Sequence, residues 1–159
     1  MRHFFIAIAT FLGVCSTGSS AKAQEYGNAI GIKFGTYSGI TYKLFVSREN
    51  AIEAGFTFGN NTLGFTGSYQ YFFPIKEVPH LNWFAGGGGH LIFISGHNSL
   101  WNDSNHDNNI ALGVNGVGGI EYKFPEIPLN IGAELGPCIN LADETKLNVH
   151  LGIFARYTF

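Results

Sequence analysis

The chain has 159 residues, of which 13% are charged, against about 25% in an ordinary soluble domain. Eleven acidic residues outnumber nine Lys and Arg, so the formal net charge is −2. This balance excludes the basic patch that nucleic-acid binding requires, and we expect no nucleic-acid partner.

The first 23 residues have the features of a secretory signal peptide. Basic residues at positions 2 and 3 precede an apolar run over residues 4–14, and Ala21-Lys22-Ala23 offers an A-x-A cleavage site. The apolar run is too short to span a membrane as a helix. We therefore predict cleavage between Ala23 and Gln24, which leaves residues 24–159 as one domain.

The two cysteines contribute little to this domain. Cys15 is removed with the signal peptide, so Cys138 is left alone and no internal disulfide is expected. Cys15 also ends a segment similar to a lipoprotein box, but Val14 stands where that motif has a small residue. A lipid anchor is therefore the less favoured alternative to a cleaved signal.

The first half of the domain contains four segments in which apolar and polar residues alternate. This period of two is typical of strands with one apolar face. We predict strands at residues 28–35, 39–46, 51–58 and 62–73. Short turns separate them, and Gly59-Asn60-Asn61 is a typical hairpin signal.

The second half repeats this organisation after a loop at residues 74–80. We predict strands at about 81–93, about 111–124, about 129–139 and 147–159, with one long polar loop between Ser95 and Asn109. Four consecutive glycines occupy residues 86–89. No Gly-Lys-Ser/Thr follows them, so we predict close packing or a bulge and no phosphate site.

Eight strands of about ten residues, joined by hairpins, predict an all-β, eight-stranded antiparallel up-and-down barrel. No later segment is apolar for long enough to form a membrane helix, so a chain that enters a membrane does so as a closed barrel. A soluble barrel buries its apolar face, whereas a transmembrane barrel exposes it to lipid.

Three features favour the transmembrane arrangement. The polar face carries mainly Gly, Thr, Ser and Asn, which suits the narrow lumen of an eight-stranded barrel better than a solvated surface. Aromatic residues gather at the strand ends, as in the two girdles of a membrane barrel. The few charges of the polar face nearly balance, so we predict a lumen network of paired charges: Lys33, Lys43, Glu53, Glu121, Lys123, Glu134 and Arg156.

The last strand carries the most specific pattern. Apolar or small residues fall at every second position from Leu147 to Phe159, and the chain ends Ala155-Arg156-Tyr157-Thr158-Phe159. The mature chain resembles the small eight-stranded bacterial outer-membrane barrels of the OmpA/OmpX-like class. The resemblance implies that Tyr157 and Phe159 form the signal recognised by the outer-membrane assembly machinery. It also implies periplasmic chaperones during biogenesis and contact with outer-membrane lipid and lipopolysaccharide.

The long loop contains candidate catalytic residues. His97 and Ser99 form an H-x-S pair, and the outer-membrane lipid A deacylases, which are also eight-stranded barrels, use His, Ser and an acid. In that family the pair lies on a strand with its acid shortly downstream. Here it lies in a loop, and no acid occurs between Asp107 and Glu121, which weakens the match.

The same loop contains candidate metal ligands. Asp103, Asn105 and Asp107 have the spacing that starts a calcium loop, but Asn108 and Val114 replace the expected Gly and Glu. His97, His106, Asp103 and Asp107 are an alternative set for a transition metal. Because neither set fixes a geometry, we expect no metal and no cofactor. Trp101, at the loop centre, either anchors a ligand or packs within the loop.

His90 and His150 are expected to face the lumen as neutral side chains bonded to a carboxylate, with a proton relay as the alternative. The function that we expect from the sequence is an integral, non-enzymatic outer-membrane barrel with a filled lumen and a structural or surface-interaction role. The alternatives are a lipid A acyl hydrolase and a soluble lipocalin-like carrier of an apolar ligand.

Overall fold

The structure is a computed structural model of the chain, and it describes residues 26–59, 62–95, 108–141 and 147–159. The predicted cleavage site at Ala23 and Gln24 lies outside the described residues. So do the loop candidates His97, Ser99, Trp101, Asp103, Asn105, His106 and Asp107. The part of the chain that is described contains no helix long and apolar enough to cross a membrane.

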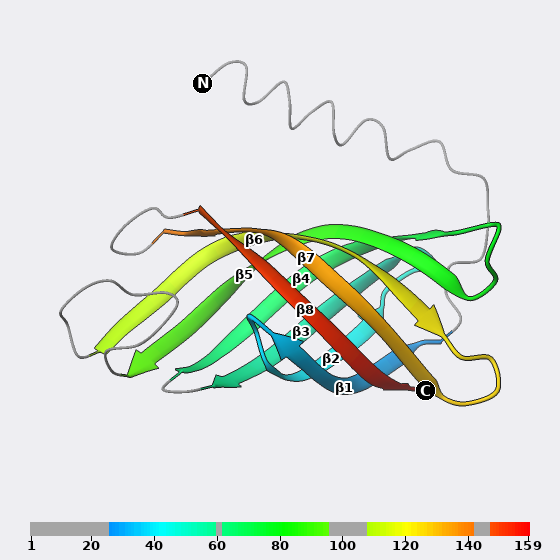
Figure 1. Cartoon of the computed structure of the whole chain (residues 1–159), viewed down its shortest axis with the longest axis horizontal. Coiled ribbons are helices and arrows are strands. Elements are labelled where there is room, and N and C mark those ends of the chain that lie inside the picture. Colours follow the sequence, from blue (N-terminus) through cyan, green and yellow to red (C-terminus); the bar gives the residue numbers. More distant parts are fainter. Residues whose placement is uncertain (1–25, 60–61, 96–107, 142–146) are drawn as a thin grey trace, which may run out of the picture.

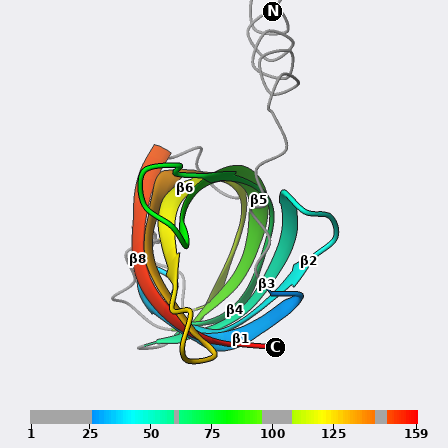
Figure 2. The ribbon, with the colours of Figure 1, turned by 90° about the vertical axis from the view of Figure 1, so that its right-hand side faces the viewer.

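Eight strands form a closed barrel in which each strand pairs with its neighbour along the chain, and all pairs are antiparallel. Figures 1 and 2 show the strands wound around a common lumen. The predicted eight-stranded antiparallel up-and-down barrel is therefore confirmed. The strands are β1 (Asn28–Gly35), β2 (Gly39–Phe45), β3 (Asn50–Gly59), β4 (Thr62–Pro74), β5 (Leu81–Ser95), β6 (Asn108–Lys123), β7 (Leu129–Asn140) and β8 (Leu147–Thr158).

The strand boundaries differ from the predicted ones by up to three residues. The largest differences flank the long loop, where β5 continues to Ser95 and β6 begins at Asn108. These extensions carry polar residues and interrupt the alternation, but each strand supplies the other with a ladder partner, from Ile94↔Asn109 to Ser95↔Asn108. Pairing between strands therefore extends both strands beyond the segment that polarity alone indicates.

The first and last strands close the barrel. β1 pairs with β8 from Ala29↔Thr158 to Gly35↔Gly152. Beyond this ladder, the Asn28 amide donates to the Phe159 carbonyl at 2.8 Å and the Phe159 amide donates to the Asn28 carbonyl at 2.9 Å. No described strand is left with an unpaired edge, so the barrel avoids the unpaired edge backbone that promotes aggregation.

The two faces of the strands have opposite chemistry. Alternation places the seven charged residues of the described strands on the lumen side, and thirty large hydrophobic side chains among the described residues remain exposed. Inward positions are often small. At Gly86 and Gly88, a Cβ atom would lie about 2 Å from a carbonyl oxygen of β4. Close packing of the narrow wall, as predicted, therefore explains two of the four glycines, Gly86 and Gly88.

Two apolar clusters occupy separate parts of the lumen. The first contains Phe45, Ala51, Phe72, Phe84, Val117 and Phe154, with Tyr26 packed against it. The second contains Tyr37, Ile92, Ile94, Ala111 and Cys138. The charged side chains of the lumen contact the first cluster, and a small polar cavity lies between the two, with Val117 and Tyr37 in its wall.

Candidate functional site

The charged centre of the lumen consists of three cations and three carboxylates. Lys33 comes from β1, Lys43 from β2 and Arg156 from β8. The carboxylates are Glu53 of β3, Glu121 of β6 and Glu134 of β7. All six residues are buried, and none is more than 8% exposed. Each lies at an inward position of its strand, so closure of the barrel brings six separate strands to one cluster.

Glu53 is the common partner of the three cations. One carboxylate oxygen accepts from Lys33 Nζ at 2.6 Å, and the other lies 2.8 Å from Arg156 Nη2 and 3.8 Å from Lys43 Nζ. The second oxygen also accepts from Gln70 Nε2 at 3.1 Å. Such a carboxylate compensates several buried cations at once, which a dry lumen requires because an unpaired buried charge is very costly.

Glu121 holds the other side of the network. Its Oε2 lies 2.7 Å from Lys43 Nζ and 3.4 Å from Arg156 Nη1, and its Oε1 accepts from the Tyr26 hydroxyl at 2.5 Å. Tyr26 in turn accepts from Asn130 Nδ2 at 2.7 Å. Burial, followed by the charge of Glu121, raises the pKa of Tyr26, so its hydroxyl stays protonated and donates.

Aromatic rings cover the cations of this network. Lys43 Nζ lies 4.5 Å from the centroid of Phe72, 5.1 Å from that of Phe84 and 5.5 Å from that of Phe154. The guanidinium carbon of Arg156 lies 3.6 Å from the centroid of Phe154. These cation–π contacts stabilise the charges and fill the space beside them, so they also help to plug the lumen.

Lys123 does not belong to the network, and its placement there by the sequence was wrong. Its ammonium donates to the carbonyl oxygens of Phe124, at 2.5 Å, and Ile127, at 3.0 Å. Lys123 is the last residue of β6, so its inward position lies at the barrel end. From there its side chain reaches the β6–β7 turn, and it forms no ion pair with a lumen carboxylate among the described residues.

A second polar group surrounds Tyr37, in the β1–β2 turn. The Tyr37 hydroxyl lies 3.3 Å from His90 Nδ1 and donates to Cys138 Sγ at 3.2 Å. His90 Nε2 lies 2.8 Å from Asn140 Oδ1. Tyr37 and Asn140 are thus partners of His90 among the described residues, and the predicted bond from His90 to a carboxylate stays a prediction.

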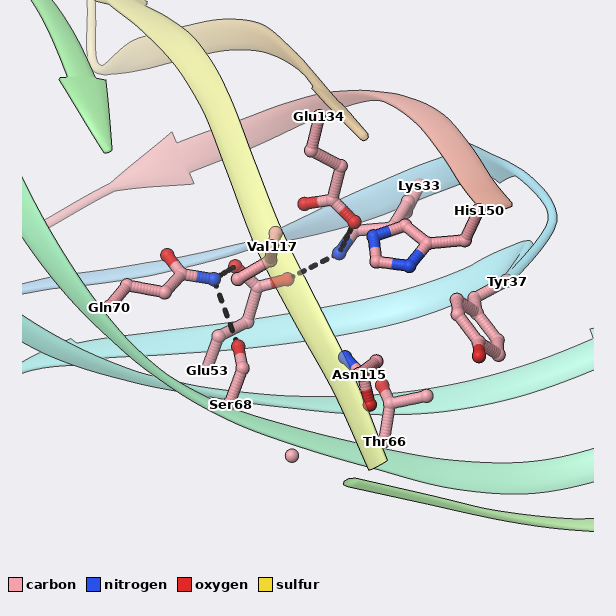
Figure 3. A pocket seen from close by; sticks show the side chains of 11 residues that line it. Lys33, Tyr37, Glu53, Thr66, Ser68, Gln70, Asn115, Val117, Glu134 and His150 are labelled. Carbon is pink, nitrogen blue, oxygen red and sulfur yellow. Dashed lines mark hydrogen bonds and ion pairs between the residues drawn. The ribbon is translucent and has the colours of Figure 1, made fainter. Parts of the chain in front are cut away.

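His150 lies beside Tyr37 at the same cavity, as Figure 3 shows, with ring centroids 5.5 Å apart. The side chain is buried, and neither ring nitrogen has a hydrogen-bond partner among the described residues. The predicted bond from His150 to a carboxylate is therefore not formed in the structure. Proton relay by His90 or His150 stays a prediction.

No group of three or more His, Cys, Asp or Glu side chains within the described ranges has a geometry suited to a metal ion. Val114, the expected end of the calcium loop, is an exposed residue of β6 whose neighbours along the ladder are Gly89 and Ile139. The other loop ligands are not described, so calcium or transition-metal binding by that loop stays untested.

The C-terminal residues lie on the exterior. Tyr157 and Phe159 are 56% and 58% exposed, and their ring centroids are 6.2 Å apart. The C-terminus lies at the same end of the barrel as the β4–β5 and β6–β7 turns (Figure 1). The two rings are thus accessible to a partner during assembly, but their role as a signal stays a prediction.

Several lumen residues were not foreseen as members of the site. Tyr26 precedes the first strand and so lies outside the alternation, and Tyr37 lies in a predicted turn. Gln70 and Asn130 lie at inward positions that the alternation assigned, but an uncharged amide gives no signal that it binds a carboxylate or a phenol. Partner choice depends on strand stagger, which the sequence does not encode locally.

Comparisons with known proteins agree with this architecture. No protein-family model matches the chain, and no curated protein matches it in sequence. The structure is similar to the N-terminal β-barrel domain of Pseudomonas aeruginosa OprF, with a TM-score of 0.61 and 18% identity over 83% of this chain and 95% of that one. Neisserial surface protein A matches with a TM-score of 0.48, 10% identity, and coverage of 83% and 93%. At 18% identity the OprF likeness shows the fold, and it confirms the resemblance to small eight-stranded barrels.

Proposed function

We propose that the mature chain is an integral outer-membrane protein whose barrel spans the bilayer with a filled, non-conducting lumen. The observation that carries the proposal is the distribution of charge. All seven charged residues of the described strands lie at inward positions, and the outward positions between the rims carry apolar, aromatic or small residues. Such an exterior is costly in water and favourable in lipid.

Aromatic side chains at both ends of the barrel support a transmembrane position. Near the end with the C-terminus, Phe73 stacks on Trp83 with ring centroids 4.0 Å apart, and Tyr122 packs against Phe124 at 5.1 Å. Toward the opposite end, Phe56 packs against Phe58 and Phe65. Two aromatic girdles that flank an apolar band are typical of barrels in a membrane.

The lumen supports this proposal over a soluble carrier of an apolar ligand. A lipocalin-like barrel needs an apolar internal cavity and a polar exterior. Here the cavity between the two clusters measures about 20 Å³ and has a wall of mainly polar side chains. It is far too small for an acyl chain, and the exterior has the opposite polarity.

A filled lumen supports a structural or surface-interaction role without a pore. The ion network and the phenylalanine rings that cover its cations occupy the space within the wall. We propose no catalytic role for these residues. The acyl-hydrolase alternative rests on His97 and Ser99, outside the described residues, and stays a prediction.

The proposed location implies a route of export. The signal peptide would direct the chain out of the cytoplasm, and periplasmic chaperones would deliver it to the outer-membrane assembly machinery. As the family resemblance implies, that machinery would recognise the exposed rings of Tyr157 and Phe159. Once folded, the barrel would contact outer-membrane lipid and lipopolysaccharide.

Cell fractionation tests the proposal. Outer membranes separated on a sucrose gradient should contain the protein, and its extraction should require detergent. Folded and heated samples should migrate differently on a gel, because closed barrels resist unfolding in the loading buffer. Recovery as a periplasmic protein that stays monodisperse without detergent would contradict the proposal.

A further inference from the structure

The cavity between the two apolar clusters lies beside the Lys33 end of the ion network. Figure 3 shows His150, Lys33 and Glu134 together on one side, with Gln70, Ser68 and Glu53 across from them. Asn115, Thr66 and Tyr37 line the remaining wall. About 20 Å³ of this space is open to the centres of water molecules, whereas one buried water needs about 10–15 Å³.

Four side chains in this wall have polar atoms that no described residue satisfies. Glu134 Oε1 accepts from Lys33 Nζ at 2.7 Å, but Glu134 Oε2 has no partner. Gln70 uses its amide nitrogen on Glu53 and Ser68, which leaves its Oε1 without a donor. Asn115 Oδ1 and both nitrogens of His150 also lack partners.

These unsatisfied atoms specify the kind of ligand that fits. Three are oxygen acceptors and therefore need a hydrogen-bond donor. His150 is 2% exposed, and a neutral imidazole presents one donor and one acceptor. A ligand that both donates and accepts can bond to each kind of atom in this group, and each buried polar atom left unsatisfied would destabilise the barrel.

The charge balance distinguishes a neutral ligand from an ion. Three lumen cations already face three carboxylates, and Lys33 bonds to both Glu53 and Glu134. An added cation would leave one positive charge uncompensated, and an added anion one negative charge, among side chains that are mostly buried. The site therefore favours a small neutral donor and acceptor.

We propose that this cavity is a hydration site that binds one water molecule, or at most two, between Glu134, His150, Asn115 and Gln70. The water donates to the free carboxylate oxygen of Glu134 and hydrogen-bonds a ring nitrogen of His150. It gives a partner to the second oxygen of Glu134, whose first oxygen bonds to Lys33, a cation that also pairs with Glu53. This inference does not depend on a membrane location.

The walls of the site predict slow exchange of this water. The phenylalanine cluster lies beyond Val117, and the Tyr37 side chain is 6% exposed on the other side. Release of the water therefore requires side chains of the lumen to move. Its residence time should exceed the tumbling time of the barrel, and this makes the site visible in solution.

Water-selective NOE and ROE spectra of the full chain, refolded in detergent micelles, test the proposal. We expect cross-peaks between water and the His150 ring proton, and between water and the Val117 and Thr66 methyl protons, with the sign of a long-lived contact. Asn115→Leu, which removes one acceptor and fills the cavity, should abolish them. Thr57→Val is the matched control, because Thr57 Oγ1 is buried and unsatisfied but lies outside the cavity wall.

Absence of these cross-peaks in the unmodified chain, or equal intensity in Asn115→Leu, would overturn the proposal. A crystal structure of the unmodified chain keeps the test decisive if Asn115→Leu does not fold. One or two density peaks at hydrogen-bond distance from Glu134 Oε2 and His150 would support it. An empty cavity, or a peak with five or more oxygen ligands at about 2.4 Å, as a bound cation requires, would overturn it.

Discussion

The lumen and the exterior of this barrel are made by alternate residues of the same strands, and they obey opposite rules. Inside, Glu53 satisfies three cations and two further carboxylates complete the balance. Outside, neighbours along β8 such as Leu151 and Ile153 are each 61% exposed. In a soluble protein the apolar set would be the core. Here the buried residues include the charged and many aromatic side chains, so in this barrel an apolar side chain is not necessarily a buried one.

Among the lumen residues, Glu53, the carboxylate shared by three cations, should contribute most to the stability of the barrel. Glu53→Gln keeps the size of the side chain but leaves three buried cations with two carboxylates, so we expect a loss of about 3–5 kcal/mol in the free energy of unfolding. Urea unfolding in lipid vesicles measures it. Lys123→Met, which removes a lysine at the rim, should change stability by about 0.5 kcal/mol or less. An equally small loss of stability in both variants would mean that Glu53 faces water.

On the exterior, a charged residue should destabilise the barrel most where the surface faces the middle of the bilayer. Leu135 lies near the centre of β7 and is 58% exposed. Leu135→Arg should cost about 2–4 kcal/mol in vesicles, because the arginine would lie in the hydrocarbon. Ile127→Arg, in the β6–β7 turn, is the control and should cost about 0–1 kcal/mol. An equally small effect at both positions would show that the band around Leu135 is solvated.

A pair of Tyr→Phe changes compares the two faces with one chemistry. Tyr26→Phe removes a bond to the charged Glu121 and leaves Asn130 Nδ2 without its acceptor, so we expect a loss of about 1.5–3 kcal/mol. On the exterior, the Tyr42 hydroxyl donates to Asn28 Oδ1 at 2.8 Å. Tyr42→Phe should cost about 0.5 kcal/mol. The same unfolding assay measures both, and a larger effect for Tyr42 would reverse the comparison.

The alternation was sufficient to predict the eight strands and to divide their residues between two faces, because a period of two depends only on local sequence. The small residues and balanced charges of the polar face, with the aromatic residues at the strand ends, then assigned the polar face to the lumen. All seven charges of the predicted network lie at inward positions, and six of them form it. The prediction for Lys123 was wrong because alternation indicates which face of a strand a residue lies on, but not how far along the barrel axis it lies. The partners of Glu53 and Glu121 depend on stagger between strands, and Tyr26 joins them from outside any strand, so neither pairing had a local signal.

The proposed contact of the exterior with lipid is tested most directly by fluorescence quenching with brominated lipids. Trp83 lies on the outward face of β5 and the next residue, Phe84, lies in the lumen. One variant keeps Trp83 as the single tryptophan through Trp101→Phe. A second adds Trp83→Phe and Phe84→Trp, which moves the indole to the lumen. In vesicles, bromines near the headgroup should quench the first variant strongly and the second weakly. Equal quenching of the two, or none for Trp83, would contradict the assignment of the apolar face to lipid.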